Sequence, residues 1–390
     1  MGQLDLVLVT LGALLLLALL GDLVSAYLPI PRVTVLVVAG LIVGPPGLDV
    51  LPPVSTEVYP VVSKLALLMV GFLLGGKLSR ATLATVGRSV FAISLCEVVG
   101  VAILVALGLM ALGVAPALAM ILGGIAPASA PAAVTNVVDD LGAKGAMTDT
   151  LLGVVAIDDA WGLITFSALL AAAQTLTGTA GAADALLHGA RELGGAIFVG
   201  VAVGVPAALV TGRLQPGKPT QAEALGVVLL AGGLAMHLEA SYLLSAMLVG
   251  AVIANLAQHH DRPFHEIEAV EWPFMVMFFV LAGASLELSA LAAVGPVAVA
   301  YLALRAGGLV VGAYAGGRLA GAPTRVRRWL GAAIMPQAGV ALGMALVAGN
   351  AFPDLRESII SLVVASTVVF ELVGPIVTRM ALVRAGEASS

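Results

Sequence analysis

Long apolar runs follow one another along almost the whole chain, and they constrain the fold more than any other feature. A helix needs about 20 mostly apolar residues to cross a hydrocarbon core of about 30 Å. Of the 390 residues, 60% are hydrophobic and only 11% are charged, a composition outside the range of soluble domains. The sequence therefore predicts an all-α integral membrane protein. Breaks at polar, glycine and proline residues divide the runs into thirteen expected transmembrane helices, at 4–26, 32–48, 58–76, 86–112, 115–138, 147–173, 190–212, 220–236, 239–257, 268–286, 292–317, 326–350 and 357–383.

Basic residues gather in alternate loops. If the N-terminus lies outside, two cations, Arg191 and Arg356, face outward, and Lys64 and Arg305 fall within spans. The fourteen cations that then face the cytoplasm are Arg32, Lys77, Arg80, Arg88, Lys144, Arg213, Lys218, Arg262, Arg318, Arg325, Arg327, Arg328, Arg379 and Arg384. The positive-inside rule therefore predicts an outside N-terminus and a cytoplasmic C-terminus. The expected location of this multi-pass protein is the cell inner membrane.

Other features of the composition exclude several partners. The net charge of −5 argues against nucleic acid as a partner. The single cysteine, Cys96, excludes an intramolecular disulfide and a cysteine-based metal site. No glycine motif for a nucleotide precedes a helix. We therefore expect no cofactor, nucleotide or nucleic acid, and a lipid bilayer as the surroundings.

An internal repeat links the two halves of the chain. Residues 72–87 (FLLGGKLSRATLATVG) resemble residues 280–295 (VLAGASLELSALAAVG) at an offset of 208, and IAPASAP (125–131) corresponds to AIMPQAG (333–339) at nearly the same offset. An odd number of spans separates the copies, so they run in opposite directions through the membrane. The pattern predicts inverted six-helix repeats, a build found in many secondary transporters.

The corresponding proline segments predict two broken helices that cross. Proline removes a backbone donor and clashes with the preceding turn, so Pro127 and Pro131, with Ser129 between them, interrupt one span. Pro336, followed by Gln337, interrupts the other. Two ordinary proline kinks are the alternative. Broken helices at membrane depth are tolerated where they line a cavity, so the matched pair favours an ion site at the midplane.

Two adjacent carboxylates, Asp158 and Asp159, lie inside the apolar run LLGVVAIDDAWGLITF. An aspartate at the centre of a span costs about 2.5–3.5 kcal/mol on insertion scales, which favours a functional role over a buried polar network. Neighbours in a helix point about 100° apart, so one carboxylate can face an aqueous cavity while the other faces a helix. Such a group can hold either a proton or a small cation.

Two further charges lie deep in spans, Glu97 and Arg305, and the repeat offset of 208 separates them. Equivalent positions on equivalent helices predict an ion pair between them. Arg305 could instead pair with Asp158, and the sequence does not decide between these partners.

Taken together, the thirteen spans, the inverted repeat, the paired breaks, AIDDAWG on the sixth span and a basic residue on the eleventh resemble the sodium/proton antiporters of the bacterial monovalent cation/proton antiporter-2 family. That resemblance implies that Asp159 binds the transported Na⁺ or a proton, supported by Asp158, and that the chains around Ser129 and Gln337 cross. It implies a homodimer in which a core domain moves like an elevator against a scaffold. The expected division is scaffold at 1–85 and 216–290, core at 86–175 and 291–390, and a linker helix at 176–215.

One residue departs from the family pattern. Electrogenic members carry lysine where this chain has Arg305, and arginine does not deprotonate in proteins. We therefore expect electroneutral exchange of Na⁺ or Li⁺ for protons, with a K⁺/H⁺ antiporter or a sodium-coupled organic anion symporter on a related fold as alternatives.

Overall fold

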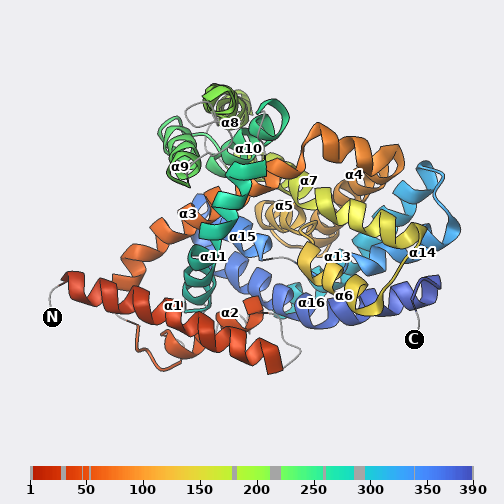
Figure 1. The fold of residues 1–390 in the computed structure, drawn as a ribbon, viewed down its shortest axis with the longest axis horizontal. Coiled ribbons are helices and arrows are strands. Elements are labelled where there is room, and N and C mark those ends of the chain that lie inside the picture. Colours follow the sequence, from red (N-terminus) through yellow and green to blue (C-terminus); the bar gives the residue numbers. More distant parts are fainter. Residues whose placement is uncertain are drawn as a thin grey trace.

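A computed structural model of the chain describes residues 3–27, 32–45, 47–51, 54–177, 182–210, 221–257, 261–284, 295–337 and 339–388. Within these ranges the protein is all-helical, with fifteen α-helices, one short 3₁₀ helix and no strand (Figure 1). The helices are α1 (Gln3–Tyr27), α2 (Arg32–Val43), α3 (Val54–Lys77), α4 (Arg80–Ala111), α5 (Pro116–Ile125), α6 (Pro131–Leu141), α7 (Ala146–Thr177), α8 (Ala182–Val210), α9 (Gln221–His237), α10 (Tyr242–Leu256), α11 (Asp261–Ala284), α13 (Gly295–Leu319), α14 (Thr324–Ala333), α15 (Val340–Ala351), the 3₁₀ turn Pro353–Leu355 and α16 (Arg356–Ala385).

The helices follow the expected spans closely. Eleven of the thirteen expected spans overlap one helix each, and the two that contain the proline segments are each divided into a pair, α5–α6 and α14–α15. Among the described residues, six segments are long and apolar enough to cross a membrane, at 87–111, 146–177, 191–210, 263–284, 295–319 and 353–385. The chain is therefore a membrane-spanning helical protein, while the number of thirteen crossings stays a prediction. Residues 285–294 of the second repeat copy lie outside the described residues.

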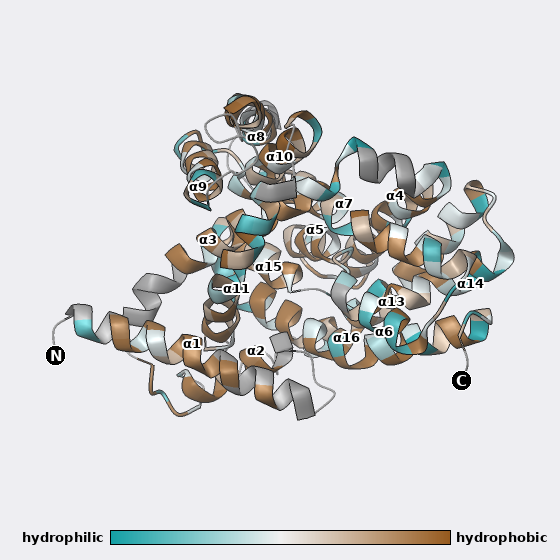
Figure 2. Cartoon of the chain, in the orientation of Figure 1, coloured by the Kyte–Doolittle hydropathy of each residue, from teal (hydrophilic) through white to brown (hydrophobic). Residues whose placement is uncertain are grey.

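Two groups of helices lie beside each other (Figure 1). In one, α3 packs against α10 and α11, α2 packs against α11, and α8 packs against α10. In the other, α4 packs against α13, α5 and α7, and α14 to α16 close the group. Contacts of α7 with α3 and α8 join the two groups. The helices drawn in Figure 2 are apolar along much of their length, and exposed side chains such as Leu16, Leu107 and Ile376 suit a lipid environment.

The contact between α4 and α13 depends on glycine. A Cβ atom added at Gly308 would lie 2.8 Å from the Cα of Val101, and one added at Gly312 would lie 2.9 Å from the Cα of Glu97. Helices in lipid associate through close packing of small residues because lipid tails are as apolar as the side chains. This glycine seam brings together the two helices that carry Glu97 and Arg305.

Candidate ion-binding site

The two broken helices meet where their chains are unwound. Helix α5 ends at Ile125 and α6 begins at Pro131, while α14 ends at Ala333 and α15 begins at Val340. Proline suits the first position of α6 because no intrahelical partner exists for an N–H there. The backbone N–H of Ala130 donates a hydrogen bond of 3.0 Å to the carbonyl of Pro336. The two unwound chains therefore contact each other through a backbone hydrogen bond, while their role as the crossing of an ion site stays a prediction.

Arg305 lies under this crossing and holds both unwound chains. Its side chain is fully buried. The guanidinium donates to the carbonyls of Ala126 and Ala128, each at 2.8 Å, and to the carbonyl of Met335 at 2.9 Å. The carbonyls at the C-terminal end of a helix have no intrahelical partner and carry partial negative charge. Arg305 therefore satisfies the ends of α5 and α14 with one planar group.

The aromatic ring of Phe370, on α16, lies against the same cation. The guanidinium carbon is 4.2 Å from the centre of the ring, a distance suited to a cation–π contact. Helices α5, α13, α14 and α16 are thus joined at one residue.

The expected direct ion pair of Arg305 with Glu97 is not formed in the part of the chain that the structure describes. Both carboxylate oxygens of Glu97 are buried and receive no hydrogen bond from a donor group among the described residues. The Glu97 carboxyl group lies close to the side chain of Asp158 and within reach of the charge of Arg305. The alternative partner, Asp158, is bonded elsewhere. The physical reason is that five N–H donors in a fixed fork match several carbonyls better than one carboxylate, and the broken helices supply those carbonyls.

Asp158 and Asp159 point to different neighbours, as the helical spacing predicts. Asp158 is fully buried, and its Oδ1 accepts a hydrogen bond of 2.6 Å from the hydroxyl of Ser94 on α4. Its other oxygen, Oδ2, receives no hydrogen bond from a donor group among the described residues, and the side chain interacts with the neighbouring carboxyl group of Glu97, also on α4. This carboxylate therefore belongs to the packed interface between α7 and α4.

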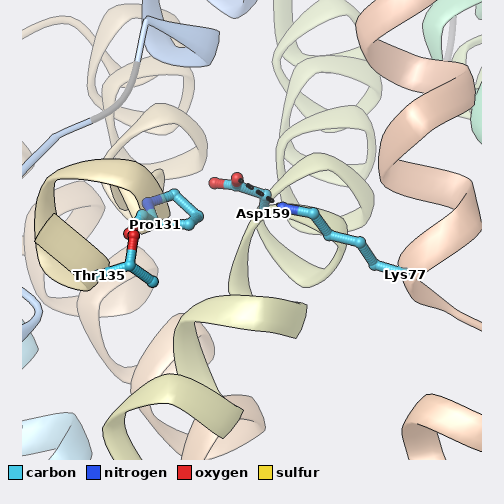
Figure 3. A network of polar contacts seen from close by, with 4 residues as sticks. All are labelled: Lys77, Pro131, Thr135 and Asp159. Atoms are coloured by element: carbon cyan, nitrogen blue, oxygen red, sulfur yellow. Dashed lines mark hydrogen bonds and ion pairs between the residues drawn. The ribbon is translucent and has the colours of Figure 1, made fainter. Parts of the chain in front are cut away.

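Asp159 faces the crossing and helix α3. Its Oδ2 lies 3.9 Å from the ammonium nitrogen of Lys77, and its side chain is 4% exposed whereas that of Lys77 is 37% exposed. The backbone amide of Ser129, in the first unwound chain, also interacts with this carboxylate. Figure 3 shows Lys77 reaching Asp159 from one side, with Pro131 and Thr135 of α6 on the other. The Thr135 hydroxyl donates to the Pro131 carbonyl at 3.0 Å.

Several buried polar atoms near the crossing lack a hydrogen-bond partner among the described residues. They include Oδ1 of Asp159 and the hydroxyl of Ser129. The buried amide of Gln337 lies close to the hydroxyl of Tyr301. Buried polar atoms are nearly always satisfied, so a group of exceptions suits a place that receives an ion or water. No cluster of three His, Cys, Asp or Glu suited to a resident metal is found in the described part of the chain.

Glycines let neighbouring helices approach the unwound chains. A Cβ atom at Gly374, on α16, would lie 2.6 Å from the Cα of Pro336. One at Gly162, on α7, would lie 3.7 Å from the Cβ of Pro127. The second unwound chain is thus held tightly by α16, and the first lies against the helix that carries Asp159.

The sequence did not predict the contact of Lys77 with Asp159, because it placed Lys77 among the cytoplasmic cations. One signal was available, because Lys77 ends an apolar span directly after Gly75 and Gly76 instead of standing in a loop. A long side chain at the end of a helix can reach back toward the membrane interior or out toward water. The choice between these directions depends on the helix that lies opposite, which the sequence does not reveal.

The start of α7 is fixed from the C-terminal end of the chain. The carboxylate of Glu387 accepts hydrogen bonds from the backbone N–H groups of Met147 (2.8 Å) and Thr148 (2.7 Å) and from the hydroxyl of Thr148 (2.8 Å). Partial burial alone would raise the pKa of Glu387, but these bonds and the nearby Arg325 outweigh it, so the pKa lies below its usual value. A negative group at a helix N-terminus also stabilises the helix dipole.

Comparisons with known proteins agree on the fold. Two structures of the sodium proton antiporter MjNhaP1 from Methanocaldococcus jannaschii are similar to this chain. One has a TM-score of 0.72 at 19% identity, covering 97% of this chain and 99% of the other. The second has a TM-score of 0.64 at 17% identity and covers both chains completely. No curated protein matches significantly by sequence.

A family profile decides the assignment. The profile described as sodium/hydrogen exchanger, transmembrane, matches residues 12–384, which is nearly the whole chain. Its members are transporters, not enzymes, and they work on transported ions without a cofactor. The chain belongs to the transmembrane sodium/hydrogen exchanger family.

Proposed function

We propose that this protein exchanges a monovalent cation, Na⁺ or Li⁺, for protons, and that Asp159 binds each of them in turn. The observation that carries this proposal is the position of Asp159, a nearly buried carboxylate at the middle of a long apolar helix, facing two unwound chains. A carboxylate in such surroundings is costly as a bare charge, so it crosses the membrane barrier only when a cation or a proton neutralises it. Exchange follows without ATP.

The residues around Asp159 supply what a small cation needs. Na⁺ prefers oxygen ligands, and the unpartnered Oδ1 of Asp159 and hydroxyl of Ser129 are buried oxygens beside the first unwound chain. Asp158 supports the site from the α4 side, where Ser94 fixes its orientation. Arg305 keeps the crossing in shape, and because arginine holds its proton, we assign one proton per cation.

The two groups of helices suggest how the site changes sides. In this proposal, residues 86–175 and 291–390 form a core that carries Asp159, and residues 1–85 and 216–290 form a scaffold through which two copies dimerise. Helix α8, within 176–215, links them. The core moves as an elevator relative to the scaffold. The protein lies in the inner membrane of the cell, with its N-terminus outside and its C-terminus in the cytoplasm. The inverted six-helix repeats account for the two equivalent orientations.

The substitution Asp159→Asn tests the assignment. Purified parent and variant are reconstituted in liposomes containing a pH-sensitive dye, a proton gradient is imposed, and sodium is added outside. We expect sodium-evoked proton movement in the parent and none in the variant, because an amide neither ionises nor balances the charge of Na⁺. Asp149→Asn, on an exposed turn of the same helix, is the matched control and should behave like the parent. Normal exchange in Asp159→Asn would reject the mechanism.

The same liposomes distinguish the ions and the stoichiometry. A rate that is the same with the membrane potential clamped or free supports one-for-one exchange, whereas a rate that depends on the potential would show that additional charge moves. Potassium more effective than sodium would assign a K⁺/H⁺ antiporter. A parent that responds to no monovalent cation would overturn the proposal and favour a symporter of organic anions.

A further inference from the structure

The chain that directly follows Lys77 at the end of α3 is attached to α10 by the side chain of Asn255. The side-chain oxygen of Asn255, on α10, accepts from the backbone N–H of Arg80 at 2.7 Å. Its amide nitrogen donates to the carbonyl of Leu78 at 3.0 Å and to that of Ala251 at 2.7 Å. The turn that follows Lys77 is therefore fastened to α10, within the group of helices that does not carry Asp159. A displacement of α7 away from this group would therefore separate Asp159 from Lys77.

A second carboxylate lies within the electrostatic reach of Lys77. Glu271, on α11, interacts with the charge of Lys77, and with that of Glu268 as well. Helix α11 packs against α3, so Glu271 and Lys77 stand in the same group of helices. Lys77 thus has two acidic neighbours. Glu271 belongs to the same group of helices as Lys77, and Asp159 belongs to the other group.

We propose that the ammonium group of Lys77 pairs with the carboxylate of Asp159 when no transported ion is bound. This ion pair acts as a tether that holds α7 against α3 until sodium displaces Lys77. This inference rests on the proposed function of Asp159. An ammonium neutralises the carboxylate as sodium would, but it belongs to the opposite helix group and cannot travel with it. The empty site is therefore held in place, whereas a site loaded with sodium is released. Glu271 offers the displaced ammonium a second partner.

The partial exposure of Lys77 makes its displacement from Asp159 feasible. A fully buried pair would cost several kcal/mol to break, whereas pairs in contact with water contribute about 0.2–1 kcal/mol. Lys77 is 37% exposed and its distance from Asp159 is 3.9 Å, so a hydrated sodium ion can compete for the carboxylate. Lys77 acts on transport through Asp159 and is a positioning residue.

The first test is Lys77→Met, which keeps the length of the side chain and removes its charge. We expect the KM for sodium to fall about two- to five-fold, as the loss of a half-exposed competitor predicts, with kcat unchanged or higher. The measurement is made at a pH high enough that the KM no longer changes with pH. Lys77→Arg should keep the KM within two-fold of the parent. Lys64→Met, on the same helix, controls for the loss of a lysine from α3.

The second test has the opposite sign. Removing the charge of Glu271 by Glu271→Gln should strengthen the hold of Lys77 on Asp159 and raise the KM for sodium about two-fold. The effect should disappear in the double variant with Lys77→Met, because no cation is left to redistribute. A merely structural role for either residue would lower kcat and stability together and would not give opposite changes in KM.

The outcomes separate this inference from the proposed function. If the parent exchanges sodium for protons and Asp159→Asn does not, but Lys77→Met keeps the parental KM or raises it, the tether is rejected and the site assignment stands. If Asp159→Asn still exchanges, the site assignment fails and the tether fails with it. Equal KM values in Glu271→Gln and the parent would reject the role of Glu271.

Discussion

Two cations approach the crossing of the broken helices, and they differ in almost every respect. Arg305 is fully buried and donates to three backbone carbonyls. Lys77 is partly exposed, with Asp159 at 3.9 Å as its ion-pair partner. A buried guanidinium that donates to three backbone carbonyls is a permanent structural part of the site, whereas an ammonium in contact with water can exchange its partner. Whether a cation in a membrane site keeps its partner or exchanges it therefore depends on the burial of the cation and on the number of its hydrogen bonds.

The largest expected effect is on the Arg305 side. Arg305→Met leaves three buried carbonyls without donors, and breaking a buried charged network typically costs about 3–5 kcal/mol. We expect a large loss of folded protein and a lower apparent Tm in detergent. Lys77→Met, by comparison, should leave the apparent Tm close to that of the parent. Equal losses in the two variants would remove the distinction between a permanent and an exchangeable cation.

Arg305→Lys sharpens the same test. A lysine keeps the charge but presents one ammonium in place of a planar fork, so it cannot reach the carbonyls of both unwound chains with the same geometry. We expect an apparent Tm between those of the parent and Arg305→Met. A parental Tm would mean that charge alone holds the crossing.

The next effect concerns the two carboxylates. Ser94→Ala removes the 2.6 Å hydrogen bond to Asp158, and a buried hydrogen bond to a charged group contributes about 1.5–3 kcal/mol. Because Asp158 faces α4 and not Lys77, we expect a lower apparent Tm with a sodium KM within two-fold of the parent. A large change in KM with an unchanged Tm would place Asp158 on the exchangeable side instead.

A smaller effect follows from the close contact of α16 with the second unwound chain. In Gly374→Ala the added Cβ would lie 2.6 Å from the Cα of Pro336, so backbone must shift, at a cost of about 1–3 kcal/mol. Gly233→Ala, on α9, where nothing lies within 4 Å of the added atom, is the control and should stabilise the helix slightly. Thermal unfolding of the two variants in detergent measures the difference. If Gly374→Ala were as stable as the control, the Arg305 side would be less rigid than its contacts imply.

The smallest effect lies away from both cations, at the start of α7. Because the pKa of Glu387 is lowered in the folded protein, its charge contributes stability above the unfolded pKa of about 4.3, and this contribution is lost as the pH falls through the lower folded pKa. Glu387→Gln should therefore reduce stability by about 1 kcal/mol or less at pH 7, since the group is only partly buried and water screens its charge. The gap in apparent Tm between parent and variant should close in strong acid. A gap that stays constant with pH would show that the amide, and not the charge, makes the difference.

Much of the helical framework could be predicted from the sequence, because it depends on local rules. Apolar length locates the spans, and proline fixes the breaks at Pro127, Pro131 and Pro336, since its ring and missing donor act within one helical turn. The divergent directions of Asp158 and Asp159 follow from helical spacing in the same way. These predictions required no knowledge of which helices are neighbours.

The partners of the two cations could not be predicted. Arg305 and Glu97 are separated by the repeat offset of 208 residues, yet the guanidinium donates to carbonyls of the unwound chains. These carbonyls are free only because α5 and α14 end there, and the fold decides where they lie. The contact of Lys77 with Asp159 likewise depends on how α3 and α7 lie beside each other. Sequence symmetry places charges on equivalent helices, but the groups that satisfy them are set by the tertiary packing.

The glycine seam between α4 and α13 has a consequence for how the protein is made. Glu97 and Arg305 are separated along the chain by 208 residues (305 − 97), so α4 leaves the ribosome long before its partner is synthesised. Until α13 is inserted, the face of α4 that packs against Gly308 and Gly312 has no partner helix. During this time the carboxyl group of Glu97 lies in the bilayer without the nearby charge of Arg305. Chains of this length fold in stages during synthesis. A truncated product ending before α13 lacks this interface, so we expect it to be degraded faster than the completed chain by membrane quality-control proteases.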